Sequence, residues 1–298
     1  MFGKSKDQDQ ATDPAVVALQ TEVERLSCNP PTITSPNSAT ATAGTAFSFT
    51  VTTCTTAVPL IQASHLPTGL YLVNNGDGTA TISGTPVPHD GGTYAAAITV
   101  GVVGQPLATQ NFAVTVDNVP VFKSKGLYTT HTGTTFTYPV TTLYGYTVPT
   151  ITSTPLPTGV TLIDLGNGTA SLAGTPGPEA GGVYPITITV TNSVATVNQS
   201  FTLTVYQVPA VTVPTSIPVT NGVPMMPVTV TYSGYPAPKV TASGLPKGLN
   251  LVNNFNGTAT ISGTPGAHIP AGTDTVTIHA SSKAGAATPQ GFRVTVSP

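Results

Sequence analysis

Residues 66–86 read LPTGLYLVNNGDGTATISGTP, and this stretch returns twice further along the chain. Residues 156–176 read LPTGVTLIDLGNGTASLAGTP, and residues 245–265 read LPKGLNLVNNFNGTATISGTP. The starting positions differ by 90 and then by 89 residues. Self-similarity at a fixed period indicates that one structural unit is repeated along the chain. The sequence therefore predicts three successive units of about 90 residues.

Each repeat has the pattern of a β-hairpin. Leu70 and Leu72 alternate with polar neighbours, Asp77-Gly78 follows, and Ala80 and Ile82 alternate again. Asx-Gly is a strong hairpin signal, because both residues tolerate a positive φ. The other units repeat the turn and the inward positions with Asn167-Gly168, Asn256-Gly257, Leu162, Leu172, Leu251 and Ile261.

The spacing of strands and turns predicts the fold class. Each unit ends on a phenylalanine followed by an alternating strand, at Phe112, Phe201 and Phe292. Short strands with frequent turns in a unit near 100 residues are typical of an immunoglobulin-like β-sandwich. We therefore predict an all-β protein of three tandem immunoglobulin-like sandwiches, at residues 29–118, 119–207 and 208–298, preceded by a short N-terminal α-helix. The connections are too short for flexible linkers, which predicts a semi-rigid rod.

Composition excludes several classes of protein. Only 7% of the 298 residues are charged and the formal net charge is −2, so no basic stripe exists for nucleic acid. No run of 18 apolar residues is present, which predicts no membrane span. The 39% of hydrophobic residues argues against a disordered chain.

The repeat resembles a known family of domains. A Gly-Tyr loop precedes LP-x-GL-x-L, and a hairpin, GTP, a Gly-Gly-x-Tyr strand and a Phe-x-x-x-V strand follow. This order resembles the immunoglobulin-like domains of bacterial surface and bacteriophage virion proteins, relatives of the cadherin-like and dystroglycan-type modules. The third unit departs from it at Gly272-Thr273-Asp274. The resemblance implies a fold and a structural or adhesive role, not a reaction.

Residues 1–28 differ chemically from the rest. They hold 8 of the 20 charged residues, and Asp13-Pro14 is a helix start followed by a stop at Asn29-Pro30-Pro31. This pattern predicts a helix over 14–27. Its apolar residues take the a and d positions of two heptads, at Val16, Leu19, Val23 and Leu26. The segment either packs on the first sandwich or serves anchoring and oligomerisation, and we expect the latter.

Other residues leave their roles open. Cys28 and Cys54 form one disulfide or remain two free thiols. Tyrosines in matching loops of the second and third units either contact a sugar or protein or pack at a domain joint, and they are Tyr144, Tyr146, Tyr232 and Tyr235. No set of residues has the spacing of a catalytic or metal site, so we expect no enzyme, no metal and no cofactor.

These features lead to a functional expectation. A start at Met1 without an apolar leader predicts a protein made in the cytoplasm, yet the domains suit an exterior surface. We expect a structural protein of a tailed bacteriophage virion, on the head or the tail, located at the virion surface. Its expected partners are other virion proteins, host cell-surface carbohydrate and further copies of itself. The alternative is a bacterial cell-surface adhesin or carbohydrate-binding module.

Overall fold

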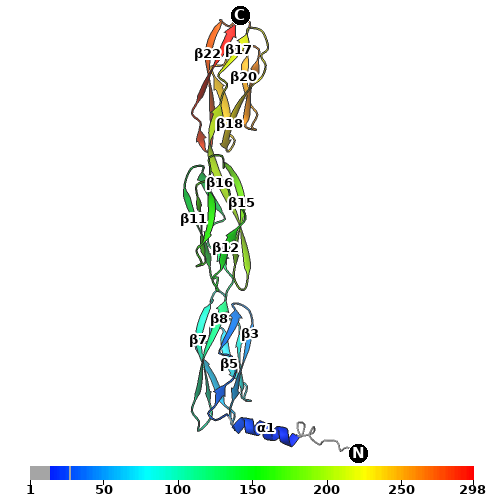
Figure 1. The fold of residues 1–298 in the computed structure, drawn as a ribbon, viewed down its shortest axis with the longest axis vertical. Helices are drawn as coiled ribbons and strands as arrows, with labels where there is room; N and C mark the ends of the chain where they lie inside the picture. The colour runs from blue at the N-terminus through cyan, green and yellow to red at the C-terminus, as the bar shows by residue number, and fades with distance from the viewer. Residues whose placement is uncertain (1–13, 27) are drawn as a thin grey trace, which may run out of the picture.

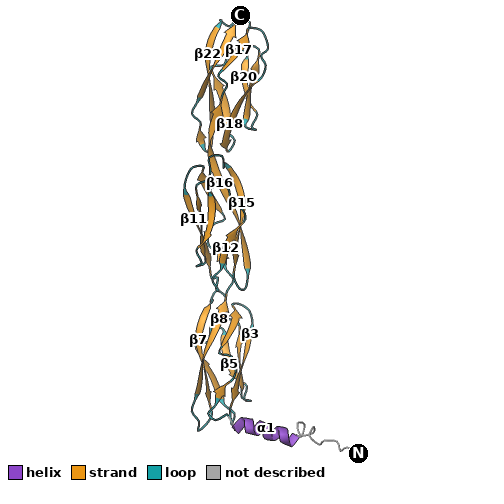
Figure 2. Ribbon diagram, viewed as in Figure 1, coloured by secondary structure: helices purple, strands orange, loops and turns teal. Residues whose placement is uncertain are grey.

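The computed structural model describes residues 14–26 and 28–298. Three β-sandwiches follow one another in a straight rod, and helix α1 (Pro14–Leu26) lies at the end opposite the C-terminus (Figure 1). Figure 2 shows that strands dominate every other described part of the chain. The predicted fold class, all-β with tandem immunoglobulin-like sandwiches after a short helix, is confirmed.

The strands recur in the same order in each sandwich. The first contains β1 (Thr32–Ile33), β2 (Ser38–Thr42), β3 (Phe47–Cys54), β4 (Leu60–Ser64), β5 (Leu70–Asn74), β6 (Thr79–Gly84), β7 (Gly92–Gly101) and β8 (Ala108–Asp117). The second contains β9 (Val121–Phe122), β10 (Leu127–His131), β11 (Phe136–Leu143), β12 (Thr150–Ser153), β13 (Val160–Asp164), β14 (Thr169–Gly174), β15 (Gly182–Thr191) and β16 (Thr196–Thr212). The third contains β17 (Ser216–Thr220), β18 (Val228–Tyr235), β19 (Lys239–Ser243), β20 (Leu249–Asn253), β21 (Thr258–Gly263), β22 (Gly272–Ser282), β23 (Gly285–Ala286) and β24 (Gln290–Ser297).

Two sheets face each other in every sandwich. In the first, the strand orders are β1-β3-β6-β5 and β2-β8-β7-β4. The short strand β2 pairs with β8 in parallel, and β10 with β16 and β17 with β24 repeat this parallel pairing. The predicted hairpin joins β5 to β6, with Leu70 opposite Gly84 and Asn74 opposite Ala80.

Each sandwich has its own apolar core. Phe112, Phe201 and Phe292 are 1%, 1% and 3% exposed, and each belongs to a separate buried cluster. The inward positions of the hairpin are also buried or packed against the cluster, as Ile82 and Leu72 are in the first sandwich. Burial of alternate residues along two facing sheets is the main stabilising term of this fold.

A pair of glycines recurs at the same two positions of each repeat because two segments of backbone approach closely there. Gly69 and Gly84 have φ angles of 93° and 136°, and a Cβ atom on either would overlap the backbone of the segment opposite. The carbonyl of Gly69 accepts a hydrogen bond from Thr85 N at 3.1 Å. The same close approach recurs between Gly159 and Gly174 and between Gly248 and Gly263.

The second joint lies inside a strand. β16 runs from Thr196 to Thr212, pairing with β15 in the second sandwich and with β18 in the third. Its pairing shifts register between Gln207 and Ala210, which is a bulge at the joint. The boundary predicted between residues 207 and 208 therefore falls within one continuous strand.

Candidate functional sites at the domain joints and the N-terminal end

Part of the predicted apolar face of α1 is open. Leu19 and Val23 are 70% and 60% exposed, whereas Val16 is partly exposed. Leu26 is the last residue of α1, and its side chain lies outside the described residues. The packing alternative requires these side chains to be buried against the first sandwich, whereas Leu19 and Val23 are largely exposed.

Cys28 ties the chain after the helix to the first sandwich. The structure bonds it to Cys54 at the end of β3, with Cα atoms 5.3 Å apart and a sequence separation of 26. A disulfide closing a loop of this length stabilises a fold by about 3 kcal/mol. The bond also fixes where α1 leaves the sandwich.

An asparagine side chain closes the first joint. The Nδ2 atom of Asn192 donates hydrogen bonds to the carbonyl oxygens of Asn118, Thr147 and Tyr146, at 2.7, 3.2 and 3.3 Å. Next to it, the Ser193 hydroxyl donates to Asp117 Oδ2 at 2.7 Å. The loop after β15 in the second sandwich therefore holds the last residues of the first.

Two of the predicted tyrosines belong to the same joint. The ring of Tyr144 stacks on His89, with ring centroids 4.0 Å apart. The hydroxyl of Tyr146 lies 2.7 Å from Thr93 Oγ1, and its carbonyl accepts from the backbone N–H of Asn118. Tyr144 is 47% exposed, so one of its faces stays open to solvent.

The second joint combines the continuous strand with side-chain contacts. Gln207 Nε2 donates to Glu179 Oε2 at 3.3 Å. The Lys283 ammonium lies 5.5 Å from the centre of the Tyr206 ring, and its hydrogen bond to Tyr206 raises the pKa of Lys283. Tyr235 pairs with Gln207, and a Cβ atom on Gly181 would collide with both side chains.

The fourth tyrosine is not at the surface. Tyr232 is 8% exposed and belongs to the core of the third sandwich, where its hydroxyl donates to Asn253 Oδ1 at 2.6 Å. A surface contact through this ring is excluded by its burial. Matching loop positions did not predict this, because Tyr232 lies on β18 and points inward, whereas Tyr235 ends the strand.

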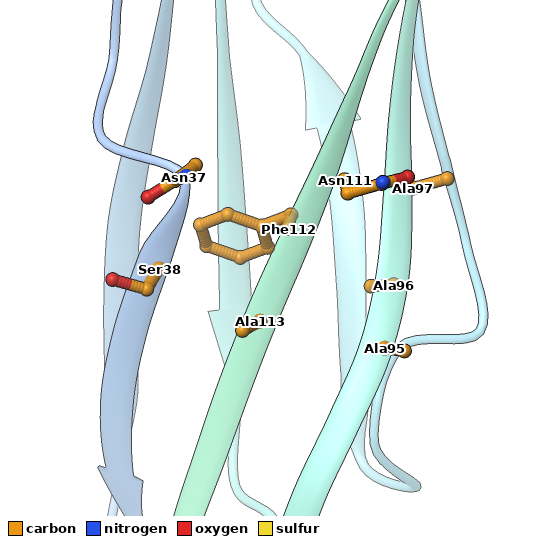
Figure 3. Close-up of a pocket in the computed structure, with 8 residues that line it drawn as sticks. All are labelled: Asn37, Ser38, Ala95, Ala96, Ala97, Asn111, Phe112 and Ala113. Carbon is orange, nitrogen blue, oxygen red and sulfur yellow. The ribbon is translucent and has the colours of Figure 1, made fainter.

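One hollow lies in the first sandwich. It measures about 460 Å³ and is lined by Asn37, Ser38, Ala95, Ala96, Ala97, Asn111, Phe112 and Ala113 (Figure 3). The lining residues come from the neighbouring strands β2, β8 and β7 and the residue before β2, and they include the buried Phe112 ring. None of the lining side chains is titratable, so the hollow offers no group for acid–base or nucleophilic chemistry.

The described residues show no arrangement of metal ligands. Within residues 14–26 and 28–298, no group of three or more His, Cys, Asp or Glu side chains could hold a metal ion. Among the histidines, His131 lies edge-on to Tyr206, and His279 Nε2 lies 3.2 Å from Ser243 Oγ. None of the helices in the described part of the chain has the length and apolar character to cross a membrane.

Sequence reasoning missed an apolar surface beside the N-terminal end. We call it the basal patch; it consists of Val58, Leu60, Val103 and Leu107, which are 68%, 61%, 103% and 72% exposed. Leu60 pairs with Gly101, and Leu107 lies against the same glycine. Aligning the three repeats would have revealed it, because Thr150 and Thr196 occupy the matching positions of the second sandwich.

Comparison with known proteins supports the fold assignment. Residues 30–117 match the family described as "Putative Ig domain". None of the curated protein sequences compared with the chain matches it.

Solved structures extend the likeness over most of the chain. A three-domain fragment of the titin I-band, I67–I69, aligns with a TM-score of 0.64 and 15% identity, covering 90% of this chain and 99% of that one. One chain from the crystal structure of Dpr2 Ig1-Ig2 in complex with DIP-Theta Ig1-Ig3 aligns with a TM-score of 0.61 and 14% identity, covering 90% of this chain and 99% of that one. At these identities the likeness concerns the fold alone. The chain is therefore a tandem of immunoglobulin-like domains.

Proposed function

We propose that the protein is a structural component of a tailed bacteriophage particle, as a head decoration, head fibre or tail-associated protein. Its N-terminal segment, residues 1–28, anchors it to a capsid or tail protein. The three immunoglobulin-like domains then extend from the virion surface and attach weakly to host cell-surface carbohydrate.

The observation that carries this proposal is the exposed apolar face of α1 at one end of the rod (Figure 1). Leu19 and Val23 lie on a helix of 13 residues, which is marginal on its own in water. Such a helix is stabilised when its apolar side is covered by another surface. A rod with an uncovered apolar helix at one end is suited to attachment through that helix to another protein.

The nature of the rod supports display rather than catalysis. Only 7% of the residues are charged, and threonine and other neutral polar residues far outnumber them. Neutral hydroxyl and amide groups suit weak, reversible contacts with carbohydrate hydroxyls. Many copies on one particle would turn a weak contact into firm attachment by avidity.

Mass spectrometry of density-banded particles tests the proposal. The protein is expected at a fixed copy number relative to the major capsid protein, and Leu19→Asp with Val23→Asp is expected to abolish its incorporation. The matched control is Leu165→Asp with Val183→Asp, which places two charges on exposed positions of the second sandwich and should leave incorporation unchanged.

Two results would contradict the proposal. Absence of the wild-type protein from the particles would overturn the virion role, and recovery in a bacterial envelope fraction would then favour the surface adhesin. Unchanged incorporation of the double Asp variant would overturn anchoring through α1.

A further inference from the structure

We propose that the N-terminal end is a self-association surface, in which α1 of one copy covers the basal patch of a second copy. The inference rests on the proposed function in that it concerns the same anchoring segment: in the free protein a second copy covers the face of α1 that a capsid or tail protein covers in the particle.

The basal patch is not required by the fold. Where the first sandwich has Leu60, Gly101 and Leu107 side by side, the second has Thr150, Thr191 and Thr196. The third has Lys239, Ser281 and Ala286 at these positions. Two sandwiches thus have polar or small residues at this end of the sheet, whereas the first exposes two leucines.

The patch has the character of an interface. Its residues lie in the segments 53–62 and 99–110, which contain no charged residue. Two copies can therefore approach there without like-charge repulsion. Clustered exposed apolar side chains on a soluble protein mark an interaction site more often than scattered ones.

Helix α1 provides a complementary surface of suitable length. Its 13 residues span about 20 Å at 1.5 Å per residue. Leu19 and Val23 lie four positions apart and so share one helical face. Covering them with the basal patch would remove two sets of exposed apolar side chains from water in one contact.

The path of the chain favours a second copy over the helix's own domain. Cys28, two residues after α1, is bonded to Cys54 on β3, whereas Leu60 lies on β4 in the opposite sheet. Helix α1 leaves this tether pointing away from the rod (Figure 1). A two-fold pair of copies lets each helix reach the other's patch and closes the assembly.

Sedimentation of the purified full-length protein tests this contact. The wild type is expected to sediment as a dimer or larger oligomer. Replacing Leu60 and Leu107 by Thr copies the second sandwich, and it should weaken self-association by about a hundredfold through lost apolar burial. Leu127→Thr with Leu165→Thr removes two exposed leucines from the second sandwich and should leave the mass unchanged.

A cross-linking experiment separates exchange between chains from folding back within one. Leu19→Cys protein is mixed with Leu107→Cys protein under mild oxidation, and a covalent pair of the two variants is expected. A monomeric wild type, an oligomer that persists in the double Thr variant, or absence of the covalent pair would each overturn the inference. Because these measurements use no particles, they fail independently of the incorporation experiment.

Discussion

Asp77 shows how one side chain fixes the turn that defines the repeat. Its Oδ1 atom accepts hydrogen bonds from Thr79 Oγ1 at 2.6 Å and from Thr79 N at 2.9 Å. The side-chain bond first, and then the backbone bond, lower the pKa of Asp77 from its ordinary value of 3.8. Asn167 and Asn256 accept the same pair of bonds in the other sandwiches without carrying a charge.

This comparison predicts a small pH dependence in the first sandwich. A carboxyl whose pKa is lowered by folding contributes stability above its unfolded pKa, and the contribution is lost as the pH falls through the folded pKa. The wild type should therefore lose some stability below about pH 3.8 that Asp77→Asn does not lose. Calorimetry at pH 7 and pH 3 measures this, with Asp274→Asn on exposed β22 as the control. An equal acid loss in Asp77→Asn and wild type would contradict the role of this turn.

A second prediction concerns the glycine pair of the second sandwich. Gly174 has a φ of 149° and would drive a Cβ atom into the backbone of Gly159, so Gly174→Ala should destabilise the domain by about 3 kcal/mol. Gly166 also has a positive φ, 70°, but nothing lies within 4 Å of its Cβ position. Gly166→Ala should therefore cost only about 1 kcal/mol. Chemical denaturation measures the free energy of unfolding of both variants. Equal losses would mean that the positive φ alone, and not the close approach to Gly159, accounts for the destabilisation.

The sequence predicts which hairpin residues point inward, but it does not show why glycine is needed at two positions of each repeat. Alternation alone predicts that Leu70 and Ile82 point inward, because side chains on a strand alternate between faces. The need for Gly69 and Gly84 arises from two segments that approach each other across the fold. Tyr232 illustrates the same limit, since local sequence did not distinguish a strand position from the loop beside it.

At the scale of elements, the joints determine how the sandwiches are held together. The short connections predicted stiffness, yet the continuity of β16 was not predictable because Pro209 is atypical of a strand interior. The register shift between Gln207 and Ala210 resolves the conflict, because a bulge accommodates a proline that cannot donate to the ladder.

At the first joint the amide of Asn192 makes the largest number of hydrogen bonds among the contacts described, which gives the next prediction. Asn192→Ala removes the donor to the carbonyls of Asn118, Tyr146 and Thr147 and should cost the joint about 1–3 kcal/mol. Both neighbouring sandwiches should stay folded while the angle between them becomes variable. Residual dipolar couplings measure this, because the two domains would then report different alignment.

The control for the joint is an asparagine of the same chemistry elsewhere. Asn221 Nδ2 donates to the Ile269 carbonyl at 2.8 Å inside the third sandwich, far from the first joint. Asn221→Ala should leave the angle between the first two sandwiches unchanged. If both domains of Asn192→Ala reported the same alignment, the amide of Asn192 would not be what fixes the angle between the first two sandwiches.

For the whole molecule, the strand lengths and the contacts at the joints together predict an extended protein in solution. Strands of 10 residues, such as β7 and β15, span about 33 Å at 3.3 Å per residue, so three sandwiches reach roughly 100–110 Å. A rod of that length has a radius of gyration of roughly 30 Å, whereas a compact chain of 298 residues would have roughly 19 Å. The difference is large enough for small-angle scattering to decide.

The same measurement tests what kind of interaction keeps the rod straight. The first joint is made mainly of hydrogen bonds from neutral donors and a ring stack, and the second of a continuous strand with few charged contacts. Screening shortens the Debye length to about 3 Å at 1 M salt, which weakens exposed charge pairs but leaves such neutral contacts in place. The radius of gyration of a variant carrying Leu19→Asp and Val23→Asp, chosen to remove self-association, should therefore be the same at low and at high salt. A radius that falls toward the compact value as salt rises would mean that electrostatic contacts, such as Gln207 with Glu179 and Lys283 with Tyr206, hold the rod straight.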